Sequence, residues 1–221
     1  MYLAGVSVRR VEDITEALWG TRVSSGTVSK LNQKIYTHIE TWRNRPIGGI
    51  YPYVYLDGIV LKRTWAGEVR NVSVLVAIGV GLDGHRSILG VAEGAKEDKS
   101  GWGGFLKHLK ERGLTGVKLI IKEMTLPKAV SLIERAVPDT LAYYAFPDTH
   151  WRSLRTNNPL ERLMREIRRR TRVVGAFPDG QSALMLVAAR LRHIATTHWG
   201  TRRYLAMEAL TQPLTEEVTA A

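Results

Sequence analysis

The apolar positions at the start of the chain repeat at helical spacing. Between residues 7 and 39 they recur every three or four residues on both sides of Gly20, which predicts two helices joined by a glycine turn. The pair fits a helix-turn-helix whose second helix would present Thr27, Lys30 and Lys34 to DNA. It fits equally well two amphipathic helices that pack on a main domain, and the spacing alone does not decide between them.

The pattern then changes from helical to extended. Runs rich in β-branched and aromatic residues, separated by short glycine-containing turns, predict three antiparallel strands. A helix and a short, wholly apolar run follow, and this run predicts a strand buried on both faces. The order indicates an α/β fold that ends in helices. The predicted strands are 52–63, 70–81, 86–94 and 117–121, and the predicted helices are 98–112, 126–137, 159–171 and 182–199.

The composition of the chain indicates what kind of partner it binds. Of the 221 residues, 44% are hydrophobic, which is enough for a buried core. The chain has 32 Lys and Arg residues but only 21 Asp and Glu residues. The formal charge of +11 points to a polyanionic partner. The absence of Cys excludes disulfides, thiolate nucleophiles and zinc ribbons. No apolar stretch is long enough to predict a membrane span or a secretory signal.

The excess of positive charge lies in one quarter of the chain. Residues 152–203 carry twelve basic residues, all of them Arg, against three acids. Guanidinium groups bind phosphate oxygens in pairs and are weakly hydrated, which favours close contact with a DNA backbone. The alternative is a solvated helix face paired with acids. The residues that we expect to bind DNA are Arg152, Arg155, Arg162, Arg165, Arg168, Arg169, Arg170 and Arg172, together with Lys30 and Lys34.

One carboxylate interrupts the most apolar predicted strand. Asp57 stands between runs of apolar residues, where a charge is costly unless a metal, a proton or hydrogen bonds compensate it. Gly58 beside it leaves room for a ligand to approach. The alternative is an Asp that caps a turn at a frayed strand end.

A second acidic position opens the predicted helix 159–171. Asn158 is expected to cap this helix, and Glu161 lies at the edge of its apolar stripe. We expect Glu161 to be the functional acid and Glu166 to form ion pairs with Arg162 and Arg170. A first-turn Glu that merely stabilises the helix N-terminus is the alternative.

Six segments of the chain resemble, in the same order, the Mutator-type transposases of bacterial insertion sequences. The resemblance covers most of residues 7–210. It implies an RNase H-like βββαβ core within 51–205, followed by C-terminal helices, with a small helical segment at 1–45 and a flexible tail at 206–221. The segments are 53–58, 90–99 with Trp102, 145–151, 158–163, 168–175 and 203–205.

The same resemblance implies a chemistry. The family carries a DDE triad on two divalent cations, Mg²⁺ or Mn²⁺, cuts DNA at the element ends and joins it to a target. Asp57 matches the first acid and Glu161 the third, and both would bind metal. The implied partners are terminal inverted repeats, target DNA and further copies of the chain, in a bacterial cytoplasm at the nucleoid.

The second acid departs from the family pattern. In the family, the strand that matches 118–121 leads to the second Asp and then to a long helical insertion. Here the strand is followed by residues 122–128, which resemble the far end of that insertion, so we predict an internal deletion near 121–124. Glu123 stands at about the right place, but its longer side chain would displace the cation. We therefore expect an impaired transposase. The alternatives are a non-catalytic DNA-binding remnant that regulates transposition and an RNase H-like nuclease.

Overall fold

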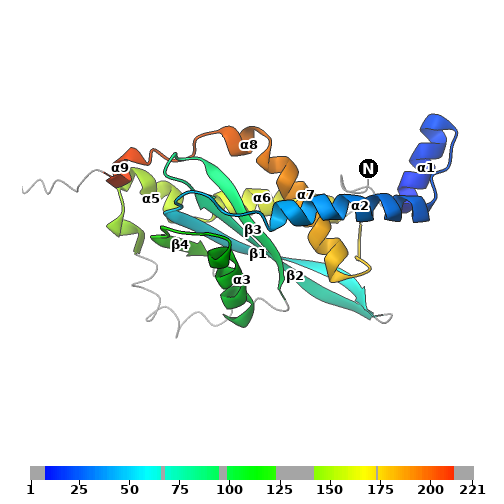
Figure 1. Ribbon diagram of the computed structural model, residues 1–221, viewed down its shortest axis with the longest axis horizontal. Coiled ribbons are helices and arrows are strands. Elements are labelled where there is room, and N and C mark those ends of the chain that lie inside the picture. The colour runs from blue at the N-terminus through cyan, green and yellow to red at the C-terminus, as the bar shows by residue number, and fades with distance from the viewer. Residues whose placement is uncertain (1–7, 66–67, 95–98, 123–141, 173, 212–221) are drawn as a thin grey trace, which may run out of the picture.

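The described chain is a mixed α/β structure, as predicted. The computed structural model describes residues 8–65, 68–94, 99–122, 142–172 and 174–211 (Figure 1). Among these residues, no helix is both long and apolar enough to cross a membrane. The strands are β1 Tyr53–Trp65, β2 Glu68–Val80, β3 Arg86–Gly94 and β4 Leu119–Lys122. The helices are α1 Val8–Trp19, α2 Ser25–Arg43, α3 Lys99–Glu111, the 3₁₀ helix η2 Ala142–Ala145, α5 Asp148–Leu154, α6 Asn158–Thr171, α7 Gly180–Ala195, α8 His198–Thr201 and α9 Glu208–Thr211.

The four strands form one sheet in the order β3-β2-β1-β4. The pairs β1–β2 and β2–β3 are antiparallel, which confirms the predicted hairpins, and the first three strands begin and end within two residues of their predicted bounds. β4 pairs in parallel with the first four residues of β1, from Tyr53 opposite Leu119 to Leu56 opposite Lys122. β1 is therefore an inner strand whose residue 57 lies just beyond the end of β4.

The prediction that the short apolar strand is buried on both faces is wrong. β4 lies at the edge of the described sheet, and its Ile120 side chain is 46% exposed. An apolar run of this length has the same appearance in an inner strand and in an edge strand with one open face. The helix predicted at 126–137 lies outside the described residues.

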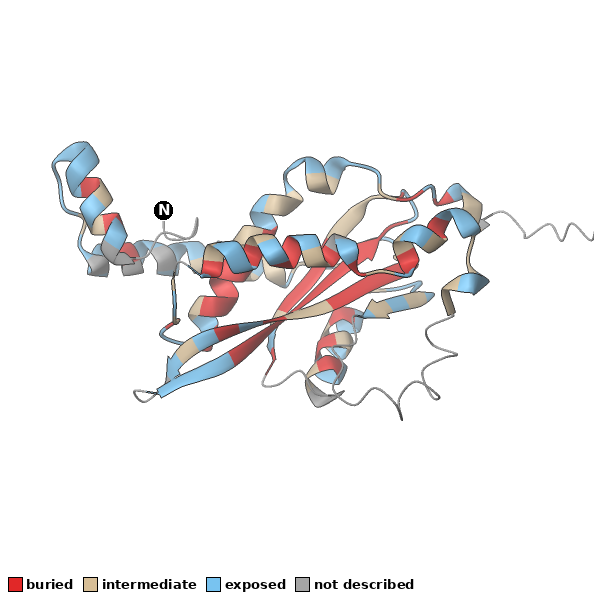
Figure 2. Cartoon of the chain, turned by 180° about the vertical axis from the view of Figure 1, so that it is seen from behind, coloured by how far each residue is buried: buried red, intermediate tan, exposed pale blue. Residues whose placement is uncertain are grey.

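The alternation of side chains along β1 divides the core into two parts. Tyr53, Tyr55 and Ile59 point to the face covered by α6 and α7, where the larger core lies. Figure 2 shows that buried residues follow one another along the middle of the sheet. Val54 and Leu56 point to the opposite face, which is covered by α3. By the same alternation Asp57 belongs to the face of α6 and α7, so the one acid of this strand is directed toward the helices of the arginine-rich quarter.

The predicted helix pair at the start of the chain is confirmed as α1 and α2. Gly20 adopts a φ of +64° between them, and the Ser24 hydroxyl caps α2 by accepting a hydrogen bond from the Thr27 amide. The end of α2 packs on α7, and Ile39 is buried in the larger core. Lys30 and Lys34 remain exposed, while α1 projects away from the sheet (Figure 1). DNA contact by these lysines stays a prediction.

The long helix predicted at 182–199 is instead two helices. α7 ends at Ala195, and α8 begins after Thr197, whose hydroxyl accepts a hydrogen bond from the Trp199 amide. A threonine cap of this kind competes with continuation of the helix, and helical periodicity does not register it. Of the tail predicted at 206–221, the structure describes residues up to 211; Met207 is buried and α9 follows it.

Gly84, in the β2–β3 hairpin, supports a stability prediction. Its φ is +77°, its carbonyl accepts hydrogen bonds from Tyr204 and Leu205, and a Cβ atom would lie 2.1 Å from the Leu205 carbonyl oxygen. We expect Gly84→Ala to lower the free energy of unfolding by at least about 1 kcal/mol. Thermal unfolding measures this loss. The matched control is Gly104→Ala in α3, where an added Cβ meets nothing within 4 Å and should stabilise the helix. Equal stability of both variants would contradict the prediction.

Candidate functional site

Asp57 lies in the interior of β1 rather than at a frayed end. It pairs with Val76 of β2, and β1 continues beyond it to Trp65, so the alternative of a turn-capping Asp is wrong. The side chain is half-buried, and its Oδ1 accepts a hydrogen bond of 2.7 Å from the Gly58 amide. A carboxylate thus stands beside the end of β4, on the face of the sheet that α6 and α7 cover.

A buried asparagine fixes the start of α6 against this point of β1. The Asn157 side chain is only 5% exposed, and its Nδ2 donates a hydrogen bond of 3.3 Å to the Leu56 carbonyl oxygen. Its main-chain carbonyl accepts from the amides of Leu160 and Glu161. The bond therefore places the first turn of α6, with the half-buried Glu161, beside the residue that precedes Asp57.

The predicted cap of this helix was assigned to the wrong residue. Asn157, not Asn158, precedes α6, and its side chain makes no capping hydrogen bond; its amide nitrogen donates to the Leu56 carbonyl oxygen of β1. The Asn157 Oδ1 is buried and has no hydrogen-bond partner within the described structure. Asn158 was expected to cap the helix, whereas its neighbour Asn157 links α6 to β1.

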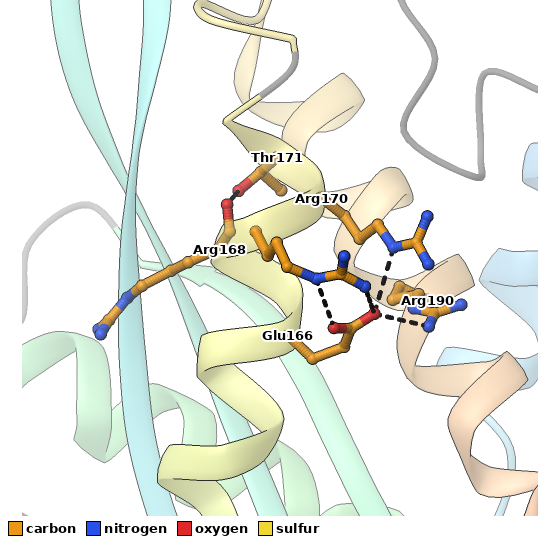
Figure 3. A network of polar contacts seen from close by, with 6 residues as sticks. Glu166, Arg168, Arg170, Thr171 and Arg190 are labelled. Carbon is orange, nitrogen blue, oxygen red and sulfur yellow. Dashed lines mark hydrogen bonds and ion pairs between the residues drawn. The ribbon is translucent and has the colours of Figure 1, made fainter.

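Glu166 forms structural ion pairs, as predicted, but with a different set of partners. It accepts from Arg169 Nε at 3.0 Å, Arg170 Nε at 3.2 Å and Arg190 Nη2 at 2.8 Å (Figure 3). The pairing with Arg170 is confirmed. Hydrogen bonds from Arg169, then from Arg170 and Arg190, lower the pKa of Glu166 to about 2 against the opposing effect of desolvation. This carboxylate joins α6 to α7 and is already neutralised.

The lowered pKa of Glu166 predicts acid-sensitive stability. The contribution of the charged group is present above the ordinary Glu pKa of 4.5 and is lost as the pH falls toward about 2. We expect Glu166→Gln to lower the free energy of unfolding by about 1 kcal/mol at pH 7. Because Gln does not titrate, thermal unfolding should show a difference from wild type that shrinks between pH 5 and pH 3. The exposed Glu111→Gln is the control, and a Glu166→Gln difference independent of pH would contradict the assignment.

The arginines of α6 lie on both sides of the helix. Arg168 extends toward the strands, while Arg170 and Glu166 lie on the side of α7 (Figure 3). Arg168 and Arg172 line a cavity of about 360 Å³ with Lys62 of β1. Of the residues that we expect to bind DNA, those exposed in the structure are Lys30, Lys34, Arg152, Arg155, Arg162, Arg165, Arg168, Arg169 and Arg172; Arg170 is half-buried.

The structure describes two of the three predicted acids, Asp57 on β1 and Glu161 in the first turn of α6. Glu123 lies outside the described residues, directly after Lys122, whose Nζ lies 4.4 Å from the centre of the Trp102 ring. Within the described ranges, no group of three His, Asp or Glu side chains is arranged to hold a metal ion. The described structure thus offers a carboxylate on β1, a carboxylate on α6, and exposed arginines on α5 and α6.

Comparison with known proteins decides the family. A family model described as "Transposase, Mutator family" matches residues 1–125 and 121–200, which together span most of the chain. This chain belongs to the Mutator family of transposases. The resemblance recognised from its sequence motifs is therefore confirmed.

The relatives of this Mutator-family chain are transposases of insertion sequences. The transposase for element IS1081 of Mycobacterium tuberculosis is 32% identical, and the alignment covers 96% of this chain and 68% of the relative. The transposase for IS406 of Burkholderia multivorans is 31% identical over 88% of this chain and 68% of its own length. The transposase for IS256 in transposon Tn4001 of Staphylococcus aureus is 27% identical over 86% and 67%.

Two details of these matches bear on the length of the chain. The two segments matched by the Mutator-family model meet and overlap at residues 121–125. The alignment with the Mycobacterium tuberculosis relative runs over 281 residues, although this chain has only 221. The relative therefore carries residues that this chain lacks.

Sequence reasoning missed two residues that shape the site. Asn157 was overlooked because its neighbour Asn158 was expected to cap α6. Nothing in a local pattern indicates a partner in a strand 101 residues away. Arg86, at the start of β3, lies outside the arginine-rich quarter but lines the same cavity as Arg152 and Arg162. Both residues act through contacts between distant segments of this Mutator-family chain.

Proposed function

We propose that this chain is the transposase polypeptide of an insertion sequence, with an RNase H-like domain that holds DNA beside Asp57 and Glu161. The observation that carries the proposal is the Asn157–Leu56 hydrogen bond, which brings the acidic turn of α6 to β1 next to Asp57. Family membership supplies the reaction class, namely cleavage of DNA at element ends and joining to a target.

The strand arrangement supports the RNase H-like assignment. Three antiparallel strands are followed by α3 and by β4, which returns parallel to β1. Such a return needs a crossover, and α3 provides it on the face opposite α6 and α7. Asp57 on the inner strand and Glu161 on a late helix then occupy the positions that we assign to the first and third acids.

The two carboxylates fit part of a divalent-metal site. Asp57 and Glu161 are hard oxygen ligands of the kind that Mg²⁺ and Mn²⁺ prefer, and we propose them as the residues that hold the ion. When bound, the metal would stabilise the charge on the attacking and leaving oxygens of phosphoryl transfer. The arginines of α6 have a different role, because they hold the DNA phosphates and so orient the strand.

We further propose that an internal deletion near residues 121–124 has removed the second acid and leaves strand transfer impaired. The overlap of the two family matches at 121–125 and the greater length of the alignment with the Mycobacterium tuberculosis relative both support a deletion. Glu123 is the one acid next to β4. Its side chain is one methylene longer than that of Asp, and an error of about 1 Å in such a site costs orders of magnitude in rate.

The partners of this proposed transposase are the terminal inverted repeats of its element, target DNA and further copies of the chain. The site of action would be the nucleoid of a bacterial cell. The exposed arginines of α5 and α6 would contact the backbone, and Lys30 and Lys34 of α2 would provide a second point of contact. Backbone contacts position DNA without reading its sequence.

A second candidate function follows from the incomplete acid set. A chain that binds element ends without joining them would act as a regulator, either by occupying the ends or by pairing with a full-length transposase. The observation that favours it is the overlap of the two family matches at residues 121–125, which supports loss of the segment that would carry the second acid. This regulator and the impaired transposase share the DNA surface and differ only in residual joining.

A binding experiment tests the shared part of the proposal. Terminal-repeat DNA is titrated with the chain in EDTA, and we expect a complex that needs no metal. Arg165→Gln with Arg168→Gln should weaken it by at least about tenfold, because each removes a phosphate contact. The control Arg192→Gln, an exposed arginine of α7 outside the expected set, should change affinity little. Failure of the wild-type chain to bind DNA would overturn the proposal.

A further inference from the structure

An arginine-lined cavity lies beside the acidic turn of α6. It has a volume of about 580 Å³ and is bordered by α5, α6, α8 and the start of β3. Among the described residues, four arginines and one acid line it; the acid is Glu166, whose charge three other guanidinium groups already neutralise. The arginines are Arg86, Arg152, Arg162 and Arg202. A cavity with this charge selects an anion.

Arg86 is held rigidly in the wall of this cavity. Its Nη2 donates a hydrogen bond of 2.9 Å to the Trp199 carbonyl oxygen, and its Cζ lies 4.6 Å from the centre of the Trp199 ring and 4.8 Å from that of Tyr204. Its Nε is buried and has no hydrogen-bond partner within the described structure. Desolvation lowers the pKa of Arg86, which marks a guanidinium taken partly out of water. The group is preorganised to meet an acceptor.

The remaining lining combines aromatic and hydrogen-bonding groups. Trp199 and Tyr204 border the cavity together with Ser153, Thr156 and Asn158. Aromatic faces stack on nucleic-acid bases, hydroxyl and amide groups bind base edges or sugars, and arginines bind phosphates. All three types of group meet in one cavity, and its volume lies in the range of pockets that hold small organic ligands.

We propose that this cavity binds one unpaired nucleotide of a DNA strand, with its phosphate on the arginines and its base against Trp199 or Tyr204. This inference rests on the proposed function for the presence of DNA, but it concerns a different site from Asp57 and Glu161. A paired duplex presents its phosphates on a convex surface and keeps its bases stacked, so it cannot fill such a cavity. An unpaired nucleotide can do so at little cost.

The cavity also lies in a useful place relative to the acids. Asn158, Arg162 and Glu166 line it from one face of α6, at steps of four residues, and Glu161 belongs to the same helical turn as Arg162. A nucleotide held here would therefore contact the face of α6 next to the one that carries Glu161. It would anchor a strand end next to the phosphate that is to react.

The test compares a duplex carrying a short single-stranded 3′ overhang with a blunt duplex of the same sequence, by fluorescence anisotropy at one salt concentration. We expect wild type to bind the overhang duplex about tenfold more tightly, the effect of stacking one base. Trp199→Leu and Arg202→Gln should remove this preference. The control Arg192→Gln loses the same charge outside the cavity and should keep it.

Two further measurements keep the result interpretable. An overhang carrying 5-iodouracil, irradiated with wild-type protein, should cross-link to Trp199 or Tyr204, which requires no variant to fold. A free deoxynucleoside monophosphate should displace the overhang only at high concentration, because it lacks the flanking phosphate contacts. Tight binding of the free nucleotide without an overhang preference would show that the cavity takes a free ligand and overturn the assignment to DNA.

The outcomes separate this inference from the proposed function. Duplex binding with no overhang preference and with cross-links outside the cavity would overturn the nucleotide site alone. Absence of any DNA binding would overturn both.

Discussion

DNA binding by this chain is expected to weaken by at least about a thousandfold when salt is raised from about 50 to about 200 mM. The reason is the number of exposed cations around α5 and α6, seven of which are arginines of the predicted DNA-binding set. Each cation that neutralises a phosphate releases condensed counterions, and added salt opposes that release. The affinity for one duplex, measured by anisotropy across this range, gives the slope of log affinity against log salt.

Paired variants test whether the salt dependence arises from the exposed arginines of α5 and α6. Arg165→Gln with Arg168→Gln should reduce its magnitude by about 2, or about 1 for each phosphate that is no longer neutralised. Arg22→Gln with Arg70→Gln removes two charges that form local ion pairs with Glu16 and Glu68, and should leave the slope unchanged. A wild-type affinity that barely responds to salt would refute the phosphate-binding role of these arginines.

Restoring the segment that we propose is missing is expected to raise strand transfer by at least about a hundredfold. The change inserts at residues 121–124 the stretch by which the Mycobacterium tuberculosis relative exceeds this chain. The physical reason is positional: the Asn157–Leu56 hydrogen bond already holds the first turn of α6 against β1, so in our proposal the site lacks one acidic ligand but keeps the elements that carry the other two. Joining of labelled terminal-repeat DNA to a target, in Mg²⁺ or Mn²⁺, measures the gain.

Variants of the restored chain identify where the gain comes from. Asp57→Ala and Glu161→Ala should each abolish joining while leaving DNA affinity within about twofold, since neither acid contacts phosphate in the absence of metal. Glu123→Ala should have little effect once the second acid is supplied. A restored chain that folds and binds DNA but does not join it would show that the defect has another cause.

Much of the fold could be predicted because it depends on local pattern. The strands β1–β3 are runs of β-branched and aromatic residues with clear turns between them, and α6 has an unbroken apolar stripe from Leu160 to Ile167. Asp57 was recognisable because a carboxylate among apolar neighbours must be compensated. Glu166 was recognisable because its arginine partners lie within one helical turn.

The features that were missed depend on contacts between distant segments. The exposed face of β4 depends on its place in the sheet, which its four residues do not encode. The Asn157–Leu56 bond and the stacking of Arg86 on Trp199 join segments about a hundred residues apart, and no periodicity reports such pairs. The extra partner of Glu166, Arg190, comes from α7 for the same reason.

The central claim is that the chain keeps its DNA surface while its acid set is incomplete. The most direct measurement is strand transfer by the unaltered chain and by Asp57→Ala, in Mg²⁺ and in Mn²⁺, at a protein concentration that saturates terminal-repeat DNA. We predict full occupancy of the DNA by both proteins, at most a trace of joined product from the unaltered chain and none from Asp57→Ala. Efficient joining by the unaltered chain that disappears in Asp57→Ala would contradict the claim.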